Sequence, residues 1–256
     1  MNVSGAFISG IVQGLTEFFP VSSSGHLVLL HALLKISTPQ LAFDIFLHLG
    51  TLLAVLIYFR KDVVALFTTE KRRGLLVLMG TVPAAAVGIL AKSAIERFFA
   101  MPKAVSAMMV VTGAWLALCS LLQRRHERAG YRTIVNVRNC LLIGLAQAVA
   151  IVPGISRSGA TIATAVGLGV DREEAFSFSF LLSLPAITGA SLLKLPEACS
   201  GFSFHEGTNF ICGGITAALI GLFALRILSK AVKSNRLYLF GIYCAAIGLA
   251  GISFFR

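Results

Sequence analysis

The sequence predicts an all-α polytopic membrane protein, with six transmembrane helices and two re-entrant helical hairpins arranged as inverted-topology repeats. Three observations lead to this fold class. Hydrophobic residues make up 57% of the 256 residues and charged residues only 13%, about half the charged share of a soluble domain. The apolar residues gather in long stretches. The 22 Lys and Arg residues, which dominate a net charge of +11, form short clusters between these stretches.

The same composition excludes an ordinary cytosolic enzyme. Basic clusters that lie between apolar runs, rather than along one polar face, are typical of membrane-topology signals, so we expect membrane lipids and no nucleic acid as partners. No Ser/Gly/Pro-rich linker, charge block or low-complexity tract divides the apolar segments. The chain is therefore predicted to form a single integral membrane domain over residues 1–256.

Six apolar stretches are long enough to span a bilayer, which takes about 20 helical residues. They are residues 41–59, 75–91, 104–122, 176–194, 210–228 and 237–255. Four further runs are too short to span, namely residues 5–19, 26–34, 141–152 and 160–170. These form two pairs, each interrupted by Pro, Ser and Gly. Because an interrupted helix exposes backbone groups that hydrocarbon does not tolerate, each pair is predicted to be a re-entrant hairpin whose break is buried or lines a wet cavity.

The two interruptions resemble each other at a constant offset of 134 residues. The matching pairs are Gly10 and Gly144, Gln13 and Gln147, Ser22 and Ser156, Ser24 and Ser158, and Gly25 and Gly159. These matches predict an internal repeat, with repeat 1 at about residues 1–122 and repeat 2 at about residues 139–256. Chance matches among common small residues are the alternative, because only Gln is rare within apolar segments.

The distribution of Lys and Arg predicts the topology. Three loops are strongly basic and are placed inside, namely residues 60–73, 123–139 and 226–236. The loop 195–209 has no Lys or Arg and the loop 92–103 has three basic residues and Glu96, so both are placed outside. Six spans alternate correctly only if both hairpins return to the side they entered, the first from outside and the second from inside. The repeats are then inverted, and their breaks face each other near the bilayer midplane.

Ionisable residues in apolar segments mark candidate functional positions, because each costs at least about 2.5–3.5 kcal/mol to insert. The first interruption, QGLTEFFPVSSSGHL, contains Glu17 and His26. Gln13 lies four residues before Glu17, so both occupy one helical face. Three consecutive hydroxyls follow, at Ser22, Ser23 and Ser24.

The second interruption, PGISRSGAT, places Arg157 between Ser156 and Ser158. A guanidinium at the start of a half-helix offers charged donors, free backbone N–H groups and a positive dipole end, and this donor set fits phosphate best. The alternative is a structural ion pair of Glu17 and Arg157, with the serines as helix caps. That alternative leaves the hydroxyl cluster and His26 unexplained. Together these groups can carry out nucleophilic or general acid–base attack on phosphorus.

Both interruptions also resemble a known family. QGLTEFFPVSSSGHL and PGISRSGATI are similar to the two signature motifs of the undecaprenyl pyrophosphate phosphatase family, bacitracin-resistance type, and residues 43–59 and 173–187 resemble two of its helices. The resemblance implies hydrolysis of undecaprenyl diphosphate to undecaprenyl phosphate and inorganic phosphate. This reaction would recycle the lipid carrier for peptidoglycan synthesis and confer bacitracin resistance. The resemblance further implies the bacterial cytoplasmic (inner) membrane and a site open to its periplasmic or outer face.

Carried over residue by residue, the family's (Glu/Gln)-x-x-x-Glu motif falls on Gln13 and Glu17, and its Pro-Gly-x-Ser-Arg-Ser-Gly motif on residues 153–159. The catalytic candidates are Glu17, Ser23, His26 and Arg157. The candidates for substrate binding are Gln13, Ser22, Ser24, Gly25, Gly154, Ser156, Ser158 and Gly159. The family also implies a divalent cation, Mg²⁺ or Ca²⁺, with Glu17 as a ligand. This chain departs from members with two carboxylates, since neutral Gln13 leaves Glu17 as the only acid in the motif.

Our mechanistic hypothesis takes Ser23 as the nucleophile and Glu17 or His26 as the acceptor of its proton. Arg157 then stabilises the charge that develops on the phosphoryl oxygens. Direct attack by water, with His26 as the base, uses the same residues and stays open.

Other readings of the sequence also stay open. A lipid transporter or flippase is the main alternative, since inverted repeats with broken helices are a transporter architecture, and a structural membrane scaffold is a third. The hydroxyl, carboxylate and imidazole groups in the first interruption favour the enzyme. Asp44 and His48, four residues apart on one span, either support the site or pack between helices. A homodimer is also left open.

Overall fold

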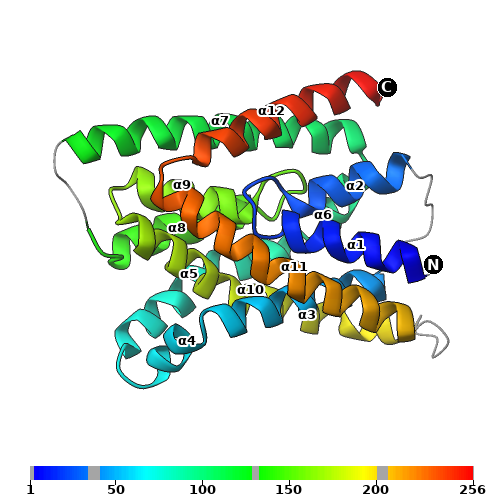
Figure 1. Cartoon of the computed structure of the whole chain (residues 1–256), viewed down its shortest axis with the longest axis horizontal. Coiled ribbons are helices and arrows are strands. Elements are labelled where there is room, and N and C mark those ends of the chain that lie inside the picture. The colour runs from blue at the N-terminus through cyan, green and yellow to red at the C-terminus, as the bar shows by residue number, and fades with distance from the viewer. Residues whose placement is uncertain (1–2, 34–40, 129–132, 201–206, 256) are drawn as a thin grey trace.

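The computed structural model describes residues 3–33, 41–128, 133–200 and 207–255, which form a bundle of α-helices (Figure 1). The six longest helices coincide with the six predicted spans: α3 (Leu41–Tyr58), α5 (Lys71–Leu90), α7 (Pro102–Arg128), α10 (Arg172–Ser200), α11 (Gly207–Lys233) and α12 (Leu237–Phe254). Five of these are long and apolar enough to cross a membrane, and α3 is the sixth when it is counted with α4 (Arg60–Phe67), from which it is bent by 78°. The protein is an all-α polytopic membrane protein, as the sequence predicts.

Four shorter helices form two broken pairs where the sequence predicts them. They are α1 (Val3–Thr16) with α2 (Ser23–Leu33), and α8 (Val137–Val149) with α9 (Arg157–Gly167). Residues 17–22 form the first break and residues 150–156 the second break, and most of both breaks is buried. α1 packs along α11 and α8 along α5, while α2 and α9 both contact α7. The long helices therefore cover the interrupted backbone.

Two segments that the sequence analysis treats as loops contain short helices instead. α4 lies within residues 60–73, and α6 (Lys92–Phe99) lies within residues 92–103; neither has a buried residue. In α6, Lys92 and Glu96 form an ion pair one turn apart at 3.9 Å. Both segments still connect long helices, and their short helices have no long apolar run in the sequence because one face of each is polar.

Charged residues from several helices meet at one end of the bundle. Arg73, at the start of α5, lies 2.9 Å from Glu174 of α10 and 3.6 Å from Asp62 of α4. Lys233, at the end of α11, lies 3.0 Å from Glu173. Two of the predicted basic segments, those around Arg73 and Lys233, thus share one end of the molecule (Figure 1).

Glycine lets the first helix of each broken pair approach a long helix closely. A Cβ atom at Gly10 would lie 2.6 Å from the carbonyl oxygen of Gly213 in α11. A Cβ atom at Gly144 would collide with the backbone of Gly80 in α5. Such small-residue contacts are typical of helix pairs in membranes, where close backbone packing replaces the hydrophobic effect. The matched glycines of the sequence repeat therefore have the same structural role.

α7 and α12 form a second close pair and lie side by side (Figure 1). A Cβ atom at Gly113 would lie 2.7 Å from the carbonyl oxygen of Gly241, and one at Gly248 would lie 2.6 Å from that of Ser106. The α7–α12 seam, defined by these four residues, is thus closed by backbone contact.

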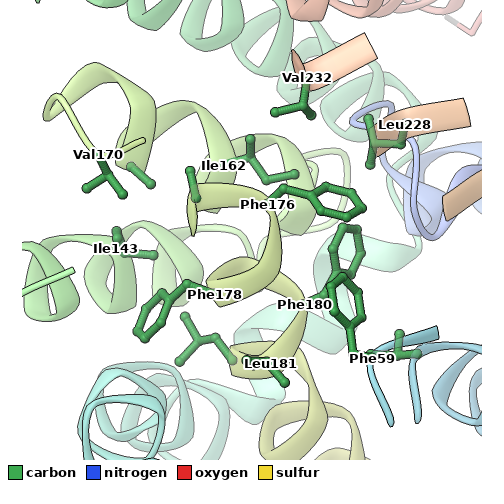
Figure 2. Packing of buried hydrophobic residues seen from close by; sticks show 14 of the residues in the cluster. Phe59, Ile143, Ile162, Val170, Phe176, Phe178, Phe180, Leu181, Leu228 and Val232 are labelled. Carbon is green, nitrogen blue, oxygen red and sulfur yellow. The ribbon is translucent and has the colours of Figure 1, made fainter. Parts of the chain in front are cut away.

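Aromatic rings of α10 and of the junction between α3 and α4 form part of a buried hydrophobic cluster (Figure 2), and this cluster includes Phe18 of the first break. Phe18, which is fully buried, packs against Phe180 of α10 with ring centroids 5.6 Å apart. Phe180 in turn contacts Phe176 at 5.1 Å and Phe59 at 5.8 Å. Because Phe18 directly follows Glu17, this packing fixes the chain at the point where the first half-helix ends.

Candidate active site

Each break ends in a serine that caps the following half-helix. Ser156 Oγ accepts a hydrogen bond from the N–H of Gly159 at 3.1 Å, and Ser22 Oγ accepts one from the N–H of Gly25 at 3.1 Å. The carbonyl oxygen of each serine also accepts the N–H of the residue four positions later. These residues are pairs related by the 134-residue offset. The two breaks therefore share their capping hydrogen bonds, although Ser22 has φ +68° and Ser156 has φ −75°.

The two breaks meet through an ion pair. Nη2 of Arg157 lies 2.6 Å from Oε1 of Glu17, and their side chains are only 17% and 7% exposed. Two longer contacts lie beside this pair, from Ser158 Oγ to the carbonyl of Phe19 at 3.3 Å and from the Gly154 N–H to Ser24 Oγ at 3.5 Å. The structure thus brings Glu17 and Arg157 together from breaks that are far apart in sequence.

Glu17 is the centre of the polar cluster. Its Oε2 atom accepts the hydroxyl of Ser23 at 2.7 Å and the side-chain N–H of Gln13 at 3.1 Å. Nε2 of His48, from α3, lies 3.8 Å from the same oxygen. Since Oε1 contacts Arg157, the two carboxylate oxygens face different partners. A carboxylate placed in this way can take the proton of Ser23 while the guanidinium holds it in position.

His26 faces a different partner from the one proposed in the sequence analysis. Its Nδ1 lies 2.8 Å from the carbonyl oxygen of Ser22, and its Nε2 lies 2.8 Å from the hydroxyl of Tyr243 in α12. A carbonyl oxygen only accepts, so Nδ1 carries the hydrogen and, in the neutral ring, Nε2 accepts the Tyr243 hydroxyl. Within the described residues, His26 makes no hydrogen bond to Ser23 or Glu17. This arrangement favours Glu17 over His26 as the acceptor of the Ser23 proton.

The family model described as "Bacitracin resistance protein BacA" matches residues 6–250, nearly the whole chain. The chain belongs to the BacA family. Both breaks of this BacA-family chain, and every residue of the polar cluster around Glu17, lie within the matched residues.

Curated relatives resemble the BacA-family chain over almost its full length. An undecaprenyl-diphosphatase of Halothermothrix orenii is 42% identical over 253 residues, covering 97% of this chain and 96% of the relative. An undecaprenyl-diphosphatase of Desulfosudis oleivorans is 43% identical over 263 residues, covering 94% of each chain. An undecaprenyl-diphosphatase of Korarchaeum cryptofilum is 40% identical over 272 residues, covering 99% of each chain.

Three residues near the breaks were not among the site candidates. The sequence offered a weak signal for His48, which lies one helical turn after Asp44. In the structure, its Nδ1 lies 2.8 Å from the Asp44 carbonyl, and its Nε2 is directed toward Glu17. Tyr243 and Thr112 gave no signal, because their contacts with the breaks join residues far apart in sequence. Such contacts depend on how α7 and α12 pack, which no local pattern encodes.

The residues present fit a divalent cation only together with substrate oxygens. No group of three or more His, Cys, Asp and Glu side chains in the described parts of the chain can hold a metal ion. Glu17 is the single carboxylate of the cluster, and Oε1 of Gln13 is buried with no hydrogen-bond partner among the described residues. One carboxylate with a carbonyl oxygen and phosphate oxygens is a suitable set for Mg²⁺, which is commonly bound by one or two carboxylates plus phosphates.

Proposed function

We propose that this BacA-family protein is a membrane-embedded phosphatase that hydrolyses undecaprenyl diphosphate to undecaprenyl phosphate and inorganic phosphate. The observation that carries the proposal is the shared carboxylate of Glu17, which accepts the hydroxyl of Ser23 on one oxygen and contacts Arg157 with the other. A nucleophile, its base and a phosphate-binding cation are thereby within reach of one another. The activity named for the curated relatives agrees with this chemistry.

The diphosphate would bind where the two half-helices begin. The first N–H groups of an α-helix have no acceptor within the helix. At the start of α9, the N–H of Ser156 bonds Thr112 and that of Gly159 bonds the Ser156 hydroxyl. The N–H groups of Arg157 and Ser158 are left to bind the substrate. Such groups at a positive helix end bind phosphate oxygens well. We assign the capping segments of both breaks to substrate binding, namely Ser22, Ser24, Gly25, Gly154, Ser156, Ser158 and Gly159.

In the first chemical step, Ser23 Oγ attacks the terminal phosphorus and its proton passes to Glu17. The Oγ–P bond forms while the bond from phosphorus to the bridging oxygen breaks, and that oxygen leaves with its electron pair on undecaprenyl phosphate. Arg157 stabilises the charge on the phosphoryl oxygens. Water then hydrolyses the phosphoserine, which releases inorganic phosphate and returns the proton to Ser23. Direct attack by water remains the competing route, and Glu17 suits the role of base there too, because Nε2 of His26 is engaged by Tyr243.

A divalent cation, Mg²⁺ or Ca²⁺, is part of the proposal. Glu17 and the side-chain amide oxygen of Gln13, Oε1, would hold the cation together with the substrate phosphates. The cation would supply positive charge that neutralises the diphosphate. Gln13 meanwhile donates to Oε2 of Glu17, so the same side chain orients the base.

The cellular role follows from this reaction. The protein would lie in the bacterial cytoplasmic membrane with its site open to the outer face, where it would recycle the lipid carrier for cell-wall synthesis and so confer bacitracin resistance. A homodimer, which the sequence leaves open, would not change this chemistry, because Glu17, Ser23 and Arg157 come from one chain.

The test is release of phosphate by the purified protein in detergent. Long- and short-chain isoprenyl diphosphates are supplied with and without chelator to the wild type, Glu17→Ala and Arg157→Ala. We expect phosphate release by the wild type and a loss of about a hundredfold or more in each variant. A flippase releases no phosphate in detergent, so an inactive wild type with bound lipid diphosphate would favour the transporter alternative over the enzyme.

A further inference from the structure

The second break is held by a hydroxyl from a helix outside the two broken pairs. Thr112, in the middle of α7, is 2% exposed. Its Oγ1 accepts the N–H of Ser156 at 3.0 Å. The same oxygen donates to the carbonyl of Gly154 at 3.0 Å, which is closer than the alternative acceptor in its own helix, the carbonyl of Met108 at 3.3 Å. One side chain therefore binds the backbone of the second break at two points.

The backbone at these two points has no helical partner. Gly154 has φ +96°, a conformation that L side chains rarely adopt, and a Cβ atom there would collide with the carbonyl oxygen of Val105. The second break thus lies directly against α7. A buried N–H or C=O group without a partner is costly, and in a membrane segment water does not replace it. The Thr112 hydroxyl provides a partner for the N–H of Ser156 and for the carbonyl of Gly154.

We propose that Thr112 is a positioning residue for Arg157, an inference that rests on the proposed function. Ser156 caps α9 and directly precedes Arg157, so the bond from Ser156 N–H to Thr112 fixes the point and direction at which α9 begins. That direction sets the 2.6 Å contact of Arg157 with Glu17 and aims the free first-turn N–H groups. Thr112 has no role in proton transfer and need not touch the substrate.

Three substitutions on α7 distinguish the effect of the Thr112 hydroxyl from the effect of side-chain volume. Thr112→Val keeps the shape and removes the hydroxyl, while Thr112→Ser keeps the hydroxyl and removes a methyl group. The matched control is Ser120→Ala, because Ser120 is also buried on α7 but its hydroxyl, among the described residues, bonds the carbonyl of Leu116 in its own helix, at 2.7 Å.

The first measurement is steady-state hydrolysis of farnesyl diphosphate in detergent. We expect Thr112→Val to lower kcat/KM by about tenfold or more, because a small displacement of a binding group costs a large factor in rate. Thr112→Ser and Ser120→Ala are expected to stay within about twofold of the wild type. Wild-type kinetics in Thr112→Val would overturn the proposal. Equal losses in Thr112→Val and Thr112→Ser would also overturn it, since they would indicate that side-chain volume matters and the hydroxyl does not.

The second measurement does not depend on turnover. Binding of the non-hydrolysable farnesyl methylenediphosphonate is measured by calorimetry for the same four proteins. Thr112→Val should bind it at least about fivefold more weakly than Thr112→Ser, because Arg157 is displaced. If the wild type binds the analogue without hydrolysing farnesyl diphosphate, the proposed function fails while this readout still decides the role of Thr112. Equal binding by all four proteins would contradict that role.

Discussion

Arg157 and Glu17 are 140 residues apart in the chain, yet Nη2 of one lies 2.6 Å from Oε1 of the other. The contact joins the start of α9 to the end of the first half-helix, and both side chains are largely buried. A structural ion pair and a catalytic pair would look alike at this distance. They differ in how stability and activity respond when both charges are removed.

Neutralising this pair separates its stability role from its chemical role. Glu17→Gln or Arg157→Met alone leaves one buried charge unpaired and should destabilise the protein by about 3–5 kcal/mol. The double variant should recover most of that stability, as measured by thermal unfolding in detergent, and still release no phosphate. Recovery of both stability and phosphate release by the double variant would favour the alternative in which Glu17 and Arg157 are a structural ion pair of the enzyme.

Replacement of Ser23 tests the covalent route. Ser23→Ala removes the hydroxyl that donates to Glu17 at 2.7 Å and should lower kcat by about a thousandfold or more. Substrate labelled in its terminal phosphate should label Ser23 in the acid-quenched wild type. Ser253→Ala is the control, since that exposed hydroxyl bonds the carbonyl of Leu249 in its own helix and, in the part of the chain that the structure describes, lies outside the polar cluster around Glu17. Full activity in Ser23→Ala would leave direct attack by water as the mechanism.

Tyr243 should determine the hydrogen bonding of His26 Nε2. Loss of the hydroxyl in Tyr243→Phe removes the 2.8 Å bond to Nε2 but keeps the parallel ring contact, whose interplanar angle is 4°. This bond joins α12 to α2, the helix that begins at Ser23. We expect its loss to lower kcat/KM by about three- to tenfold, which corresponds to the free energy of one ordinary hydrogen bond. The ¹⁵N resonance of His26 Nε2 should shift while Nδ1 stays protonated. Tyr238→Phe, on the same helix, is the control, and an unchanged His26 spectrum in Tyr243→Phe would contradict the assigned contact.

A second carboxylate should strengthen the proposed cation site. Gln13→Glu places another acid one helical turn before Glu17, where the orphaned Gln13 oxygen now lies. We expect the Mg²⁺ concentration for half-maximal activity to fall by about tenfold, because ligand charge tunes affinity for hard cations. Activity without added cation should also fall, since two carboxylates then repel each other. Titration of chelator-treated protein measures both effects, and an unchanged Mg²⁺ dependence would contradict the assignment.

Apolar run length and Pro/Gly/Ser interruptions were sufficient to place the six long helices and both breaks. The sequence offered helix capping only as an alternative role for the serines, and Ser22 and Ser156 do cap the half-helices that follow them. That the repeats enter the membrane from opposite sides stays a prediction.

The partners of the site residues were harder to predict. The sequence paired Ser23 with either Glu17 or His26, and the structure joins it to Glu17. His26 instead meets Tyr243, which lies 217 residues further along the chain. Contacts of this kind depend on the packing of helices that are distant in sequence, whereas hydropathy reports only each helix by itself.

The α7–α12 seam has a consequence for both breaks. Thr112 of α7 binds the second break, while in α12 Cys244 donates from Sγ to the carbonyl of Pro20 at 3.4 Å and Tyr243 meets His26. α12 therefore supports the first break, whereas α7 binds the second break and also contacts α2. A bulky side chain introduced at Gly113 would push the supports apart and disturb the anion-binding half and the nucleophile-bearing half together, although the substitution itself lies in neither.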